Sequence, residues 1–138
     1  ALPRGGVPVA IEVARALGSE RMTLLGQLVG TPDFMSPEQV RGEEIDSRAD
    51  IYSLGTLLFY LVTARYPVSG RTVDEVREAH ARGEYTRLRD LRADVPAGFV
   101  RAIEQALAVI PHERFKTAGE MESALEAVAA PGDAQHAP

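Results

Sequence analysis

The alternation of apolar and polar residues predicts helices along most of the chain. Apolar side chains in residues 51–62 recur at helical spacing, and aromatic residues fill the remaining sides. A Ser-Arg-Ala-Asp run at residues 47–50 resembles a capping box with Asp in place of the usual Glu. We therefore expect a long helix from there to about Arg65 that is buried nearly all round. Pro67 follows, and proline disfavours helix in the residue before it.

Weaker patterns on either side predict shorter elements. Capping residues, prolines and apolar stripes indicate further helices over about residues 36–41, 72–82, 96–107 and 117–128. Residues 9–17 mix apolar and charged side chains and predict a short strand and turn. Residues 84–94 are charged and rich in arginine, which indicates a surface crossover. The expected fold is mainly α, with four substantial helices, one short helix and little strand.

Composition narrows the function classes. The chain is 45% hydrophobic and 25% charged, as expected of an ordinary globular domain. Its net charge is -5 without a basic stripe, so phosphate backbones are repelled on average and no nucleic-acid partner is expected. The chain has no cysteine, and its histidines (His80, His112 and His136) lack metal-ligand spacing, so we expect neither disulfides nor a metal site.

The longest apolar run is too short to span a bilayer. It covers residues 51–62 and is interrupted by Ser53, Gly55 and Thr56. The N-terminus lacks the continuous apolar core of a signal peptide, so we expect a cytoplasmic location. The sequence begins with Ala1 rather than Met, which is compatible with a piece of a longer protein.

Two motifs carry the most information about function. Residues 30–39 read G-T-P-D-F-M-S-P-E-Q, and residues 50–55 read D-I-Y-S-L-G in an apolar helix. Together they resemble the end of the activation segment and the following core helix of a bacterial eukaryotic-like (Hanks-type) serine/threonine protein kinase. The resemblance covers about residues 13–128. It implies the helical C-terminal lobe of the protein-kinase fold, with the N-lobe and the catalytic loop absent.

The resemblance also implies a domain organisation and a set of site residues. We expect a non-matching leader at residues 1–12, a partial kinase domain at residues 13–130 and a disordered tail at residues 131–138. The substrate-binding loop would comprise Gly30, Thr31, Pro32 and Phe34. The structural residues of the kinase motif would be Ser36, Pro37, Glu38, Asp50, Gly55 and Arg114.

Three of these expectations concern particular side chains. In the family, the glutamate of Ser-Pro-Glu pairs with an arginine near the end of the lobe, which corresponds here to Glu38 and Arg114. The family's counterpart of Asp50 receives backbone N–H groups from the catalytic loop. Without that loop, Asp50 should be hydrated or have a raised pKa. Thr23 occupies the activation-loop position and is a candidate phosphorylation site, although a solvated loop hydroxyl is the favoured interpretation of this residue.

The parts that handle ATP in a kinase are missing from this sequence. It contains neither a G-x-G-x-x-G loop nor a His-Arg-Asp motif, and its single lysine, Lys116, lies far beyond the activation-segment motif. Ala10, Ile11 and Glu12 stand where the family has Asp-Phe-Gly, and alanine cannot bind magnesium. We therefore expect no catalytic residues, no metal and no cofactor in this chain, although the family uses ATP and magnesium.

Three interpretations follow. In the first, the chain is a partial serine/threonine kinase domain, a transferase family that phosphorylates protein serine or threonine with ATP, and is catalytically inert by itself. In the second, it is a pseudokinase-like helical module that binds a protein through the helix at residues 72–82 or the loop at Gly30. In the third, it is an unrelated helical bundle with chance motifs. A protein substrate or regulator is the expected partner, and self-association is expected because loss of the catalytic loop exposes apolar surface of the central helix.

Overall fold

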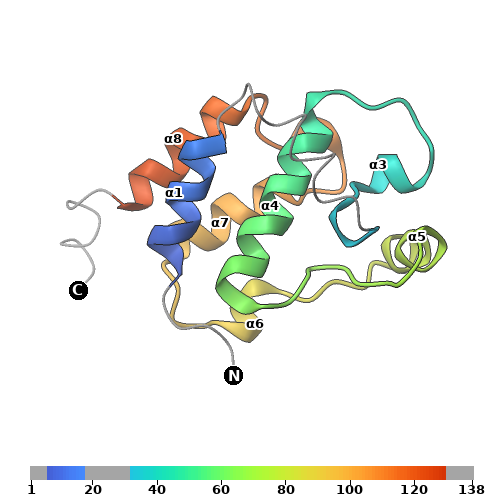
Figure 1. Cartoon of the computed structure of the whole chain (residues 1–138), viewed down its shortest axis with the longest axis horizontal. Coiled ribbons are helices and arrows are strands. Elements are labelled where there is room, and N and C mark those ends of the chain that lie inside the picture. Colours follow the sequence, from blue (N-terminus) through green and yellow to red (C-terminus); the bar gives the residue numbers. More distant parts are fainter. Residues whose placement is uncertain (1–5, 18–31, 130–138) are drawn as a thin grey trace.

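The computed structural model describes residues 6–17 and 32–129, and within them every regular element is a helix (Figure 1). In chain order these are α1 (Val7–Leu17), η2 (Pro32–Phe34), α3 (Pro37–Val40), α4 (Ser47–Thr63), α5 (Val73–Arg82), α6 (Leu88–Leu91), α7 (Ala97–Ala106), η3 (Pro111–Glu113) and α8 (Ala118–Ala129). The mainly α fold predicted from the hydrophobic pattern is confirmed.

Helix α4 is the central element of the fold. Most of its apolar side chains are buried, including Tyr52, Leu54, Leu58, Phe59 and Val62. Helices α1 and α7 pack against it, and α8 packs against both of them (Figure 1). Because α4 is covered from more than one side, its sequence is apolar nearly all round, as predicted.

The start of α4 differs from the prediction in detail. The N-cap residue is Asp46, whose carboxylate accepts a hydrogen bond from the backbone N–H of Arg48 at 2.9 Å. Ser47, predicted to cap the helix, is instead its first residue. Asp and Ser are about equally good N-caps. Two such residues in succession therefore do not tell, from sequence alone, which of the two precedes the first residue of the helix.

Helix α1 corrects the prediction of a short strand and turn at residues 9–17. Ala10, Ile11 and Ala14 are buried at helical spacing against the main core. Arg15 at the far end of α1 forms an ion pair with Glu126 of α8. The helix begins at Val7, so residues 7–12, which the sequence assigned to a leader, pack with the rest of the described chain.

A second, smaller core joins α3 to α5. Val40, Val68, Val76 and Ala79 are buried together, with Met35 packed against them. Helix α5 has the predicted caps: the Thr72 hydroxyl accepts from the N–H of Glu75, and Gly83 takes the left-handed conformation at the end, with φ of 67°. This unit contacts α4 through η2 and through the rings of His80 and Tyr52, so it lies against the segment that contains the kinase-like motif.

The arginine-rich segment predicted as a surface crossover is partly buried. It contains the short helix α6, and Leu88 is only 2% exposed. The guanidinium of Arg92 is also buried, donates to the carbonyl oxygen of Val62 at 2.9 Å and forms an ion pair with Asp94. The crossover therefore ties the end of α4 to α7, a role that composition alone does not reveal.

Candidate functional site

The Ser-Pro-Glu motif forms a fully capped turn at the start of α3. The Ser36 hydroxyl accepts from the N–H of Gln39 at 3.3 Å, and the Gln39 side-chain oxygen accepts from the N–H of Ser36 at 2.8 Å. Pro37 occupies the first helical position, where its fixed φ is favourable. This reciprocal cap fixes the backbone at Glu38 and so orients its side chain. Glu38 is only 4% exposed.

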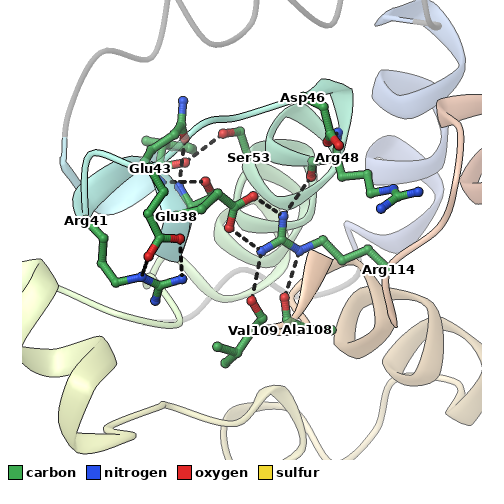
Figure 2. A network of polar contacts seen from close by, with 12 residues as sticks. Glu38, Arg41, Glu43, Asp46, Arg48, Ser53, Ala108, Val109 and Arg114 are labelled. Carbon is green, nitrogen blue, oxygen red and sulfur yellow. Dashed lines mark hydrogen bonds and ion pairs between the residues drawn. The ribbon is translucent and has the colours of Figure 1, made fainter. Parts of the chain in front are cut away.

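Glu38 and Arg114 form a buried, two-pronged ion pair, the contact that the kinase resemblance implies (Figure 2). Arg114 Nη1 donates to Glu38 Oε2 at 2.6 Å, and Nη2 donates to Oε1 at 2.8 Å. This geometry suits the planar guanidinium, because its paired N–H groups match the two carboxylate oxygens.

The remaining N–H groups of Arg114 reach three backbone carbonyls, so the guanidinium has no free donor. They donate to the carbonyl oxygens of Ala108 at 2.7 Å, Arg48 at 3.0 Å and Val109 at 3.3 Å (Figure 2). Arg114 therefore joins the start of α4, the end of α7 and the Ser-Pro-Glu turn. We call this arrangement around Glu38 and Arg114 the clasp.

The electrostatics of the clasp favour the charged pair. Burial by itself would raise the pKa of the Glu38 carboxyl, but the hydrogen bonds from Arg114 and from nearby backbone outweigh it and lower the pKa below its usual value. Tyr52 lies beneath the guanidinium, with the Arg114 Cζ 5.2 Å from the ring centroid. The pair is therefore ionised at neutral pH and surrounded by low-dielectric material.

The described end of the predicted substrate loop is anchored to the same framework. Ser53 of α4 donates from its hydroxyl to the carbonyl oxygen of Phe34 at 2.7 Å in a buried contact. The Asp33 carboxylate accepts from the backbone N–H of Gly70 at 3.1 Å. Pro32 and Phe34 thus lie in a short helical turn, η2, that is held from two directions. Gly30, Thr31 and the candidate phosphorylation site Thr23 lie outside the described residues.

Asp50 lies in the first turn of α4, and its carboxylate makes no hydrogen bond or ion pair with the described residues. Its burial raises the pKa of the carboxyl, the direction expected when the loop that would donate to it is missing. Gly55 lies where α4 crosses α7: a Cβ there would come within 2.9 Å of the Ala106 Cβ. This glycine therefore allows the two helices to approach closely.

The residues that the sequence resemblance assigned to the family's metal motif lie in a packed helix. Ala10 is fully buried in α1, and Glu12 is exposed and pairs with Arg15. In the described part of the chain, no group of three His, Asp or Glu side chains gathers as a metal ion would need. None of the described helices is long and apolar enough to cross a membrane.

Sequence reasoning missed the side chains that surround the clasp and the loop. Ser53 is one of three buried polar residues in the apolar helix α4, with Thr56 and Thr63, and a buried polar side chain is a signal for a hydrogen bond. His80 of α5 is 8% exposed and packs on Tyr52 with ring centroids 5.9 Å apart. Phe34 and Tyr66 are in edge-to-face contact, and Tyr66 in turn stacks on Tyr60. Tyr60 and Tyr66 gave no periodic signal in the sequence, because Tyr60 lies on α4 and Tyr66 follows that helix.

Comparison with known proteins agrees with this geometry. The family model described as protein kinase domain matches residues 12–126. Serine/threonine-protein kinase PknB of Mycolicibacterium smegmatis is 36% identical over 115 residues, which cover 82% of this chain and 18% of that protein. A probable serine/threonine-protein kinase of Corynebacterium efficiens is 36% identical over 129 residues, covering 88% of this chain and 20% of its own.

A third relative is a kinase of Bacillus subtilis. Serine/threonine-protein kinase PrkC of Bacillus subtilis is 32% identical over 114 residues, covering 83% of this chain and 18% of that protein. The chain therefore spans a fifth or less of the length of these curated relatives.

Proposed function

Since the chain belongs to the protein kinase domain family, we propose that it is the part of a bacterial serine/threonine kinase domain that receives the protein substrate. The observation that carries this proposal is the clasp between Glu38 and Arg114, together with the bond from Ser53 to Phe34. These contacts hold the described end of the proposed substrate loop against α4. A rigid loop can position an acceptor hydroxyl, which phosphoryl transfer requires.

The chain as given is proposed to be inert toward ATP. Phosphoryl transfer needs groups that cradle the phosphates, ligands for magnesium and a residue that aligns the acceptor. The single lysine lies beyond the clasp, and a buried alanine, Ala10, stands at the place of the metal-binding aspartate. Asp50, without a partner in the described chain, is where the backbone of a catalytic loop would dock in a complete domain.

The first experiment tests the inert state. We expect no change in melting temperature when magnesium and ATP are added at millimolar concentrations, and no phosphate transfer to a protein substrate. Binding at a hundred times the dissociation constant would add about 2.7 kcal/mol to the free energy of unfolding and raise the melting temperature by several degrees. Such a rise, seen with magnesium-ATP and not with magnesium alone, would overturn this part of the proposal.

The second experiment tests where a protein substrate binds. A threonine-containing peptide is titrated into isotope-labelled chain, and backbone amide shifts are followed by NMR. We expect shift changes around η2 and at Gly70, whose N–H is tied to Asp33. Changes confined to α5 would contradict this proposal and support the alternative, a helical protein-binding module. The charged face of α5 is partly self-neutralised, since Arg77 pairs with Asp74 and Arg82 with Glu78.

A further inference from the structure

A cavity of about 280 Å³ lies between α4, the segment that leads into α6, and α7 with the turn that follows it. Its walls are largely apolar, and the side chains that form them include Phe59, Leu88, Ile103 and Leu107. Tyr85 and Val109 also line the cavity and are 44% and 38% exposed, so it opens at the surface of the molecule. The contacts of the proposed substrate loop do not use this space.

The cavity borders the clasp. Tyr52, whose ring lies beneath the Arg114 guanidinium, is one of its lining residues. Ala108 and Val109 are two more, and their carbonyl oxygens accept hydrogen bonds from Arg114 (Figure 2). A molecule in the cavity would therefore contact residues that hold Arg114 in place. If it bound only the folded chain, it would raise the free energy of unfolding by mass action.

Tyr52 supplies an unsatisfied polar group to this cavity. The residue is 1% exposed, and its hydroxyl forms no hydrogen bond with the described residues. Burial raises the pKa of the Tyr52 phenol, so the hydroxyl is neutral at ordinary pH and can both donate and accept. A buried hydroxyl without a partner is unfavourable and uncommon in folded proteins. A ligand that places one polar atom against this hydroxyl would satisfy it.

The volume and the charges of the cavity restrict the ligand further. Engineered apolar cavities of about 150 Å³ hold benzene, so a volume of about 280 Å³ suits two fused rings. Arg87 and Glu104 also line the cavity, and neither forms an ion pair with the described residues. Because their charges are opposite, the opening has no strong preference for an anion or a cation. A neutral molecule can also enter the apolar interior at the lowest cost in desolvation.

We propose that this cavity binds a small neutral bicyclic aromatic molecule with one ring N–H or hydroxyl group, which forms a hydrogen bond with the Tyr52 hydroxyl. Apolar walls with a single well-placed polar group are typical of small-molecule sites, in which the polar group sets the orientation. This inference goes beyond the substrate-loop proposal and does not depend on it, because no residue of η2 lines the cavity.

The test compares the binding of indole and indene. Indene has the same bicyclic shape, but a methylene group replaces the ring N–H that would donate to Tyr52 Oη. Each compound is titrated into chain isotope-labelled at its Ile, Leu and Val methyl groups, so that NMR shifts report both the site and the dissociation constant. We expect shifts at Ile103, Leu107 and Val109. Indole should bind about three- to tenfold more tightly than indene, which is the contribution of one neutral hydrogen bond.

Three variants assign the preference to this cavity. Tyr52→Phe removes the hydroxyl and keeps a ring beneath Arg114, so indole should lose its advantage while both compounds still bind. Ala108→Leu places a larger side chain in the cavity and should weaken the binding of both compounds strongly. Ala127→Leu is the matched control: Ala127 lines a different cavity, between α7 and α8, so binding should be unchanged. Circular dichroism confirms that each variant is folded.

The results that would overturn this inference are distinct from those that test the substrate loop. Equal binding of indole and indene, or a preference for indole that persists in Tyr52→Phe, would exclude the hydrogen bond to Tyr52. Shifts confined to the other cavity, such as those of Val128, or no binding of either compound, would exclude the site itself. The substrate-loop proposal is tested separately, by peptide-induced shifts around η2 and at Gly70.

Discussion

Arg114 uses all of its N–H groups within the fold, and it is the cation that forms an ion pair with Glu38 among the described residues. The two oxygens of Glu38 receive two of these bonds, and three backbone carbonyls receive the others. Removal of either charged partner leaves the other buried without compensation, which costs far more than the net contribution of the intact pair. Breaking the clasp should therefore lower the free energy of unfolding strongly, even if the intact pair contributes little to it.

A substitution at Glu38 tests this reasoning. Glu38→Gln removes the negative charge and keeps the shape, so we expect the free energy of unfolding to fall by about 3–5 kcal/mol. Urea denaturation measures the change. The control is Glu43→Gln, which breaks the exposed pair with Arg41 and should leave the denaturation midpoint nearly unchanged. Equal effects of the two substitutions would contradict a special role for burial.

His80 gives the fold a pH dependence whose sign can be worked out. Both ring nitrogens are buried, and neither has a hydrogen-bond partner of ordinary geometry among the described residues, although the backbone of Met35 acts on the ring. Burial, with a smaller contribution from Arg41, lowers the pKa of the imidazole to about 4. The unfolded chain takes up this proton near pH 6.5, so between these values it binds more protons than the folded chain. The free energy of unfolding should therefore decrease as the pH falls from about 6.5 to about 4.

Replacement of His80 by an aromatic residue that cannot titrate should flatten this dependence. His80→Phe keeps an edge-to-face contact with Tyr52 and removes the proton site. Urea denaturation between pH 4.5 and pH 7, about the window set by these two pKa values, provides the comparison. Glu38 contributes in the same direction only at lower pH, because its pKa in the folded chain lies below the usual value. Parallel curves for the two proteins would exclude His80 as the source.

Among the elements, the crossing of α4 and α7 is the most sensitive to side-chain volume. Gly55→Ala would place a methyl group 2.9 Å from the Ala106 Cβ and 3.2 Å from the Leu107 Cδ2. We expect a net loss of about 1–3 kcal/mol from overpacking, despite the better helix propensity of alanine. Gly119→Ala in α8 is the control: its nearest neighbour would be the Thr117 hydroxyl at 3.7 Å, so it should stabilise the chain. Thermal denaturation of both variants measures the difference. A Gly55→Ala variant more stable than the parent chain would contradict this prediction, because α4 and α7 would then accommodate the methyl group without cost.

The elements that sequence predicted well are those whose signal is local. Helices α5 and α8 begin at capping threonines, Thr72 and Thr117, whose hydroxyls accept the expected backbone hydrogens. Helix α1 was missed because its apolar stripe is short and consists partly of alanine. Its helical state is supported by packing against α4 and α8, which no local pattern records. Tertiary contacts therefore determine that α1 is helical.

The candidate site divides in the same way. The contact between Glu38 and Arg114 was predicted from a resemblance that spans both residues, since nothing local links them. The carbonyl partners of Arg114 could not be predicted, because they depend on how the chain turns after α7 and on how α4 packs beside that turn. Arg92 was assigned to the surface from the charged composition of its segment, yet it is buried and bonds to the backbone at Val62. A long arginine can lie inside a fold when carbonyl oxygens receive its hydrogens.

For the whole molecule, the open question is what the exposed apolar residues do. Sequence reasoning predicted self-association through the central helix, but α1 covers part of α4, which leaves Tyr60 as its exposed large side chain in the described chain. Val109 and Ile110, beside the clasp, are 38% and 44% exposed. We expect the chain to associate as its concentration rises, with Val109→Ser and Ile110→Ser together reducing association. Light scattering over a concentration series measures this, and a monomer at every concentration would contradict it.

The wide separation of the two charged partners also affects the time course of folding. Glu38 and Arg114 lie 76 positions apart along the chain, so closing that loop has a high entropic cost until the intervening helices are docked. The contact should therefore form after the rate-limiting step, and its loss should accelerate unfolding while leaving the refolding rate nearly unchanged. Arg114 would then determine the lifetime of the folded chain and have little influence on how quickly the chain folds.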